Sequence, residues 1–214
     1  MDCHICNQST ELFIHKKTNI TYYHCKPCEY IFKASEFYQD LETQKERYNL
    51  HENNEKDTRY RAYFQRFVDF VLPQVHDVST ALDFGCGKTS LLVSLLEEQG
   101  IACDYYDPIY HPNTLDDTKK YKLIVSTEVF EHLHQPCEVF ERLLATLHGR
   151  GYLAIQTEFH SNDRGIFEKW WYPQDPTHIV FFRPKTFEIL AERYGCSVIA
   201  VNHKNMILLQ KNKA

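Results

Sequence analysis

Short apolar segments alternate with amphipathic segments from residue 57 to the end of this chain, and no other feature restricts the fold as strongly. The runs 80–84 (TALDF) and 121–127 (YKLIVST) are nearly continuous apolar stretches, which is typical of buried parallel strands. Between the strand-like runs, leucines recur at helical spacing, with a proline near the start or a glycine at the end. This alternation predicts a mostly parallel α/β sheet with helices on both faces.

The other expected elements follow the same pattern. Helices are expected from about residue 58 to Pro73 and at 91–100, 136–149 and 184–195, and further strands at 101–106 and 151–157. Two strand-like runs in the tail, 196–211, flank the turn-forming sequence Asn-His-Lys-Asn. They predict a C-terminal antiparallel hairpin that completes a domain over 57–214.

Four cysteines near the N-terminus form two tight pairs, Cys3-x-x-Cys6 and Cys25-x-x-Cys28, with 18 residues between them. This spacing is typical of a four-cysteine zinc site. A segment this short buries too little apolar surface to fold alone, whereas tetrahedral zinc supplies roughly 10 kcal/mol or more. We therefore expect a zinc-ribbon module at 1–40 and a polar linker at 41–56. Two disulfides or four unrelated thiols are the alternative.

The composition is that of an ordinary globular protein of 214 residues, with 43% hydrophobic residues and a net charge of −5. No apolar run approaches the roughly 20 residues that span a bilayer, and the N-terminus lacks the regions of a signal peptide. We therefore expect a cytoplasmic location without a membrane span. The acidic balance argues against a nucleic-acid partner. No feature of the sequence specifies an oligomeric state.

The segment LDFGCGKTS (82–90) lies between a predicted strand and a predicted helix, where open α/β sheets bind ligands. A phosphate-binding P-loop needs a glycine five residues before Gly87, but Leu82 stands there. A dinucleotide fingerprint needs a third glycine where Ser90 stands. In addition, Asp83 would repel a pyrophosphate. Both readings are therefore rejected.

A cationic nucleoside without phosphates fits this loop better. S-adenosylmethionine (SAM) carries an ammonium and a sulfonium group, and an acidic residue such as Asp83 favours it, directly or through its effect on the loop. Gly85 and Gly87 allow the backbone to approach the ligand closely. Asp107 ends the second strand, 20 residues after Gly87, and can accept hydrogen bonds from the ribose hydroxyls. A tight turn without a ligand is the alternative.

Four segments carry a resemblance to a known family: LDFGCG (82–87), YYDP (105–108), YKLIVSTEVFEHL (121–133) and GRGYLAIQT (149–157). In this order and spacing they resemble class I SAM-dependent methyltransferases with a Rossmann-like domain. The similarity is greatest to the ubiquinone-biosynthesis and sugar methyltransferase group. The resemblance implies cofactor-binding roles for Asp83, Gly85, Gly87, Asp107, Thr127 and Glu128. The chain departs from the family after Asp107, where too few residues remain for the usual helix–strand–helix. The third strand is therefore expected to be short or missing.

Two stretches are candidates for the methyl-acceptor side. Glu128, Glu131 and His132 follow the 121–127 strand and can act as a base, as a substrate anchor or as ligands of a catalytic metal. The simpler alternative is that Glu131 and His132 only fix the loop by hydrogen bonds.

The second stretch, 158–182, is rich in aromatic residues. Trp170, Trp171 and Tyr172 are candidates to cover the acceptor, or they simply pack on the sheet edge. His178 is a candidate base, and the family resemblance strengthens this assignment. His178, His132 and Glu128 are thus the predicted catalytic residues.

Three functions follow from these features. The first is a SAM-dependent methyltransferase that modifies a small molecule and holds a structural zinc. The second is an RNA- or protein-modifying methyltransferase that grips its substrate with the ribbon. Residues 1–40 contain four lysines and no arginine against five acidic residues, so they form no phosphate-binding face. The third is a non-catalytic binding protein, which the intact acidic and glycine positions disfavour.

Overall fold

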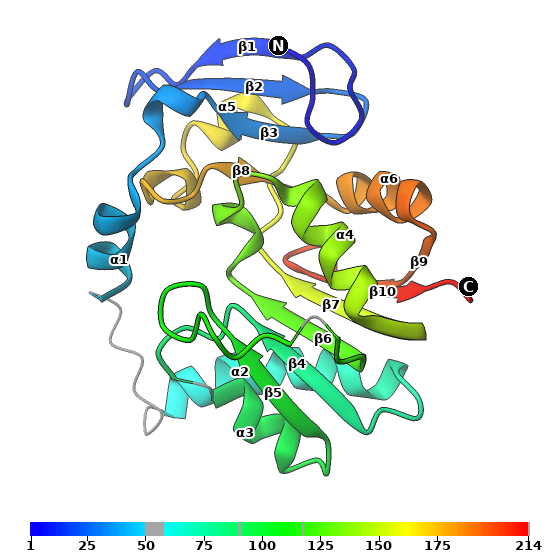
Figure 1. Ribbon diagram of the computed structural model, residues 1–214. Coiled ribbons are helices and arrows are strands. Elements are labelled where there is room, and N and C mark those ends of the chain that lie inside the picture. Colours follow the sequence, from blue (N-terminus) through cyan, green and yellow to red (C-terminus); the bar gives the residue numbers. More distant parts are fainter. Residues whose placement is uncertain (50–57, 90, 117, 214) are drawn as a thin grey trace.

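The computed structural model describes residues 1–49, 58–89, 91–116 and 118–213. Two β-sheets lie one above the other in Figure 1. The larger has six strands and carries the helices on its faces. The smaller has four strands, three of which come from the N-terminus.

The larger sheet confirms the predicted α/β fold class. Its strand order is β5-β4-β6-β7-β10-β9. The strands are β4 (Thr80–Phe84), β5 (Ala102–Tyr106), β6 (Tyr121–Thr127), β7 (Leu147–Gln156), β9 (Cys196–Val201) and β10 (Met206–Lys211). The first four positions in this order are parallel, and β10 runs antiparallel to both β7 and β9. The predicted C-terminal hairpin is therefore present.

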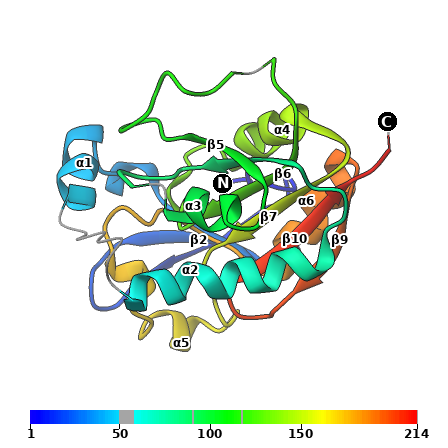
Figure 2. The ribbon, with the colours of Figure 1, turned by 90° about the horizontal axis from the view of Figure 1, so that it is seen from below.

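Helices cover both faces of this sheet (Figures 1 and 2). The helices α2 (Thr58–Val71) and α3 (Leu91–Glu97) share one apolar core with Leu123 and Val125 of β6. The helices α4 (Pro136–Thr146) and α6 (Pro184–Tyr194) share the other core with Ile124, which lies between those two residues. Alternate residues of β6 thus enter opposite cores, as the two-residue period of a strand requires.

The helix ends follow local signals with one exception. Gly100 and Gly195 both adopt positive φ angles, 78° and 68°, after α3 and α6, which is the usual backbone of a helix C-terminus. The helix at 136–149 was expected to end at Gly149, but α4 ends at Thr146. Leu147 already pairs with Tyr121 in the sheet, so strand pairing stops the helix early.

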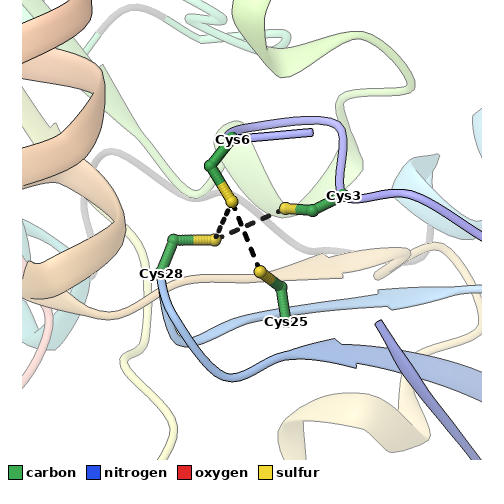
Figure 3. A group of neighbouring side chains, drawn as sticks. All are labelled: Cys3, Cys6, Cys25 and Cys28. Carbon is green, nitrogen blue, oxygen red and sulfur yellow. Dashed lines mark hydrogen bonds between the residues drawn. The ribbon is translucent and has the colours of Figure 1, made fainter. Parts of the chain in front are cut away.

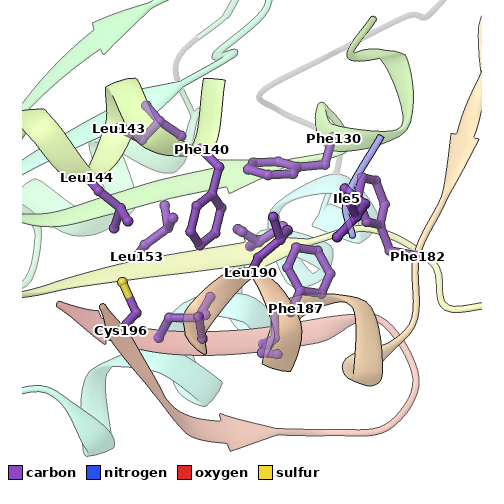
Figure 4. Packing of buried hydrophobic residues seen from close by; sticks show 14 of the residues in the cluster. Ile5, Phe130, Phe140, Leu143, Leu144, Leu153, Phe182, Phe187, Leu190 and Cys196 are labelled. Atoms are coloured by element: carbon purple, nitrogen blue, oxygen red, sulfur yellow. The ribbon is translucent and has the colours of Figure 1, made fainter. Parts of the chain in front are cut away.

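The smaller sheet joins two segments that are distant in sequence. Its order is β1 (Glu11–Ile14), β2 (Thr21–Cys25), β3 (Tyr30–Lys33) and β8 (Val180–Phe181), and β8 comes from the aromatic-rich stretch. Figure 4 shows Ile5 beside Phe130 and Phe182, in the core shared with α4 and α6. The N-terminal segment therefore packs into the same apolar core as the larger sheet.

The remaining described segments are short. They comprise α1 (Leu41–Asn49), α5 (Arg164–Phe167) and the 3-10 turns η1 (Ser35–Phe37), η2 (Leu72–Gln74), η3 (Phe130–His132) and η4 (Tyr172–Gln174). The helix α1 occupies the start of the predicted linker, and the rest of that linker, 50–56, lies outside the described residues. The 1–40 and 57–214 boundaries stay a prediction. No helix in the described part of the chain has the length and apolar character to cross a membrane.

The segment between β5 and β6 contains no helix or strand in its described residues, 107–116 and 118–120. A single bridge links Asp107 to His111. The strand β5 is consequently an edge of the larger sheet, and the third strand that the family resemblance implies has no counterpart in these residues.

Candidate functional site

The glycine turn after β4 lies against two neighbouring elements. Gly85 and Gly87 have φ angles of 83° and 68°, which favour glycine. The backbone N–H groups of Gly85 and Cys86 donate to the carbonyl of Tyr106 over 2.7 and 3.1 Å. A Cβ atom on Gly85 would lie 2.2 Å from Cγ2 of Val129. Gly85 is therefore required for the close approach of the loop after β6.

The carboxylate of Asp107, at the end of β5, is held by three backbone amides. Oδ1 accepts hydrogen bonds from the N–H groups of Ile109 (2.8 Å) and Tyr110 (2.9 Å), and Oδ2 accepts one from Gly87 (3.0 Å). A carboxylate has about four acceptor positions. Among the described residues, one acceptor position therefore remains open, and the bond from Gly87 ties Asp107 to the glycine turn.

Asp83 is buried at the carboxyl end of β4. Its side chain is 2% exposed, and Oδ1 has no hydrogen-bond partner among the described residues. Burial, and then the nearby charge of Asp107, raises the pKa of Asp83 to about 7. An ionised carboxylate in this position is costly without a cationic partner. The Oδ1 atom of Asp83 is thus an acceptor without a partner among the described residues, which supports the prediction that Asp83 suits a cationic ligand.

Replacing Asp83 by asparagine should change how stability depends on pH. The folded-state pKa near 7 lies above the unfolded value of about 3.9. The contribution of this group is thus fully present below pH 4 and lost as pH rises through 7. Asparagine does not ionise, so the stability of Asp83→Asn relative to wild type should increase from pH 5 to pH 8.

Urea unfolding of the ligand-free proteins at several pH values measures this difference. Asp69→Asn, at an exposed position on α2, is the matched control. A stability difference between Asp83→Asn and wild type that is constant with pH would show that Asp83 titrates normally.

Thr127 and Glu128 lie where β6 leaves the sheet. Glu128 has a φ of 54°, which is unfavourable for a non-glycine residue and is often found at functional sites. The hydroxyl groups of Tyr63 (2.7 Å) and Tyr172 (3.1 Å) donate to its two carboxylate oxygens. Burial, and then the neighbouring Glu131, raises the pKa of Glu128 to about 8.

Tyr63 and Gln156 were not among the site residues expected from the sequence. Tyr63 lies on the helix α2, and its hydroxyl donates a hydrogen bond to Glu128 and accepts one from the Gln156 amide. A tyrosine on an otherwise apolar face was the available signal, because a buried tyrosine hydroxyl usually has a partner.

The structure brings Glu131, His132 and His178 together. One carboxylate oxygen and one nitrogen of each ring all lie within 4.8 Å of one another. The two imidazole centroids are 4.8 Å apart. Burial lowers the pKa of both histidines, that of His178 to about 3, so both rings are neutral at neutral pH.

Of the three aromatic residues expected over the acceptor, two turn inward. Tyr172 is fully buried, and the ring of Trp170 lies 5.0 Å from it between centroids. Trp171 is 62% exposed. A surface pocket beside this stretch is lined by residues that include His160 and Trp170, but by none of the predicted catalytic, cofactor-binding or metal-binding residues.

The side chains of Cys3, Cys6, Cys25 and Cys28 converge (Figure 3). Three Sγ–Sγ distances among them are 3.4, 3.4 and 3.6 Å, and no disulfide joins them. All four sulfur atoms lie within 4.8 Å of one another, and three of the side chains are buried. Four converging thiols match the donor set of structural zinc.

These observations first define a class of protein. A mostly parallel sheet with a glycine turn after one strand and an acidic residue after the next is typical of a Rossmann-like domain. A family model described as a methyltransferase domain matches residues 56–201. The chain therefore belongs to this methyltransferase domain family.

Solved structures share the fold at low sequence identity. An O-methyltransferase family protein from Burkholderia thailandensis has a TM-score of 0.56 at 13% identity, covering 80% of this chain and 63% of that one. A SAM-dependent methyltransferase from Methanosarcina mazei has a TM-score of 0.51 at 13% identity, covering 68% and 98%. The plantazolicin methyltransferase BpumL, in complex with a triazolic desmethylPZN analog and SAH, has a TM-score of 0.51 at 16% identity, covering 81% and 92%. A search of curated proteins found no match.

Proposed function

We propose that this protein transfers a methyl group from SAM to a small-molecule acceptor. The observation that carries the proposal is the buried carboxylate of Asp83, whose Oδ1 atom has no hydrogen-bond partner among the described residues and lies at the base of the glycine turn. The methyltransferase family supports it. So do the names of two similar structures, one a SAM-dependent enzyme and one bound to SAH, the demethylated product.

The residues present fit SAM. Asp83 provides a negative charge for the methionine end, and Gly85 and Gly87 form the turn beside it. Asp107 has one acceptor position left for a ribose hydroxyl. Thr127 and Glu128 form the floor of the proposed site. In this arrangement the acidic groups attract a cation and repel phosphates.

On the acceptor side, the protein mainly holds the acceptor atom in line with the methyl group. Bound SAM supplies an electrophilic methyl on a sulfonium. Positioning of this kind is worth roughly 7–11 kcal/mol in the best intramolecular reactions. Glu128, with a pKa of about 8, is the proposed base, and such bases typically contribute about 10²–10⁴-fold. His132 and His178 complete the proposed catalytic set.

The four-cysteine cluster is proposed to hold zinc in a structural role. Cys3, Cys6, Cys25 and Cys28 provide four ligands, which leaves no open position for catalysis. The N–H of Ile5 donates to Sγ of Cys3 over 3.4 Å, an outer contact that stabilises a thiolate. A cytoplasmic location, which we keep as a prediction, would hold these thiols in the reduced state.

The class of acceptor is tested with SAM labelled on its methyl group. The protein is incubated with a cell extract that contains small molecules, RNA and proteins, and the label is then separated into acid-soluble and acid-precipitable fractions. We expect transferred label in a new acid-soluble compound with the wild type and not with Asp107→Ala. Label in RNA or protein would support the macromolecular alternative instead.

A further inference from the structure

A cluster separate from the four cysteines contains Glu131, His132 and His178. The residues come from two segments, because η3 carries the first two and the loop before β8 carries the third. The N–H of Ile179 donates to the carbonyl of Glu131 over 2.8 Å and so holds the two segments together. The Glu131 side chain is fully buried, and that of His178 is 8% exposed.

The hydrogen bonds around this cluster determine which ring nitrogen of each imidazole carries the hydrogen. Nδ1 of His132 lies 3.0 Å from the carbonyl oxygen of Thr177, and Nδ1 of His178 lies 2.8 Å from the carbonyl oxygen of Tyr172. A carbonyl only accepts hydrogen bonds, so each Nδ1 carries the hydrogen. In a neutral ring, Nε2 then carries the lone pair. Metal-binding histidines are oriented in this way by partners of the second nitrogen.

The carboxylate of Glu131 is only half satisfied. Oε2 accepts a hydrogen bond from the hydroxyl of Thr157 at 2.8 Å, whereas Oε1 has no hydrogen-bond partner among the described residues. Oε1 lies 3.8 Å from Nε2 of His132, beyond hydrogen-bond reach. Two imidazole lone pairs and a carboxylate oxygen thus gather in one buried place. A bound cation would accept both lone pairs and balance the carboxylate charge, so it would satisfy all three groups at once.

We propose that Glu131, His132 and His178 bind a divalent transition-metal ion. Two imidazoles and one carboxylate favour Mn²⁺, Fe²⁺, Co²⁺ or Zn²⁺ over Ca²⁺. Three protein ligands leave coordination positions open, as in catalytic metal sites. Tyr172 links this cluster to the proposed site floor, because its hydroxyl donates to Glu128 and lies 3.3 Å from Oγ1 of Thr157.

The role that we propose for the metal depends on the proposed methyl transfer. The binding of the metal to these three residues does not depend on it. An open coordination position next to Glu128 suits an oxygen atom of the methyl acceptor, which the metal would orient and polarise. The metal would also ease loss of a proton from an acceptor hydroxyl. The expected acceptor is therefore a compound with an oxygen that can coordinate a metal.

Titration of the full chain with Mn²⁺, followed by electron paramagnetic resonance, tests the site. Mn²⁺ is the probe because carboxylate ligands suit it and thiolates do not. We expect one Mn²⁺ per chain in the wild type. Glu131→Gln and His178→Gln should each bind at least about tenfold more weakly, since even outer partners of metal ligands are worth roughly 10–100-fold. His134→Ala, at an exposed position two residues from His132, should bind like the wild type.

Circular dichroism and SAH titrations of the same proteins separate the possible failures. Absence of Mn²⁺ binding by folded wild type, or equal binding by Glu131→Gln, would overturn the metal site. If SAH did not bind but Mn²⁺ did, the proposed function would fail while the metal site stood. If SAH bound and Mn²⁺ did not, only the metal site would be lost.

Discussion

Replacing Cys25 and Cys28 together by serine should remove one zinc ion per chain and strongly destabilise the smaller sheet. Structural zinc contributes roughly 10 kcal/mol or more in small zinc domains. Tyr30 and Phe32 of β3 are buried in the core shared with α4 and α6. The loss of stability should therefore extend beyond β1–β3 and lower the apparent free energy of unfolding of the whole chain.

Metal analysis and denaturant unfolding measure the two effects. In the Co²⁺-substituted protein, absorption from sulfur-to-cobalt charge transfer should be present in wild type and absent from the double variant. This band reports only thiolate ligands, so an ion bound to histidines does not confuse it. Cys103→Ser, on β5 away from the cluster, is the control. An unchanged zinc content in the double variant would contradict the four-cysteine site.

Asp107→Ala should weaken the binding of SAH at least about tenfold. A hydrogen bond to a charged acceptor is worth roughly 1.5–3 kcal/mol, which corresponds to about 10–150-fold in affinity. The substitution also removes the acceptor of the Gly87 N–H, so the glycine turn loses its link to β5. Isothermal titration calorimetry with SAH measures the change without turnover.

Asp104→Ala is the matched control for this variant, because Asp104 lies on β5, three residues before Asp107. Its carboxylate accepts hydrogen bonds from Lys119 and from the hydroxyl of Tyr121, and it is not part of the proposed site. We expect SAH affinity close to that of wild type. Equal affinities of wild type and Asp107→Ala would remove Asp107 from the cofactor site.

The larger sheet was predictable because its signals are local. The strand β6 is an apolar run, and α6 begins with Pro184 and ends before Gly195. The pairing of β8 with β3 was not predictable, because two residues of strand have no periodicity and their partner lies about 150 residues earlier. The early end of α4 was not predictable either, because it also depends on a residue distant in sequence. Pairing of Leu147 with Tyr121 in the sheet overrides the local helix propensity.

In the candidate site, too, some contacts could be predicted from the sequence and others could not. Asp83 lies near the end of β4, and Gly85, Gly87 and Asp107 follow strand ends, so their proximity could be inferred from the topology of a parallel sheet. The partners of Glu128 come from a helix and from a long loop, and no sequence pattern connects Tyr63 with Tyr172. The approach of His178 to Glu131 also depends on this loop. The spacing of residues therefore predicted the proximity of the residues proposed for the cofactor better than that of the residues proposed for the acceptor.

We propose that the buried carboxylate of Asp83, at the base of the glycine turn, selects a cationic nucleoside. Calorimetric titration of the wild-type protein with SAM, ATP and NAD, in the same buffer near pH 7.5, tests it most directly. We expect one SAM bound per chain and no measurable binding of ATP or NAD. Tight binding of ATP or NAD together with no binding of SAM would contradict it.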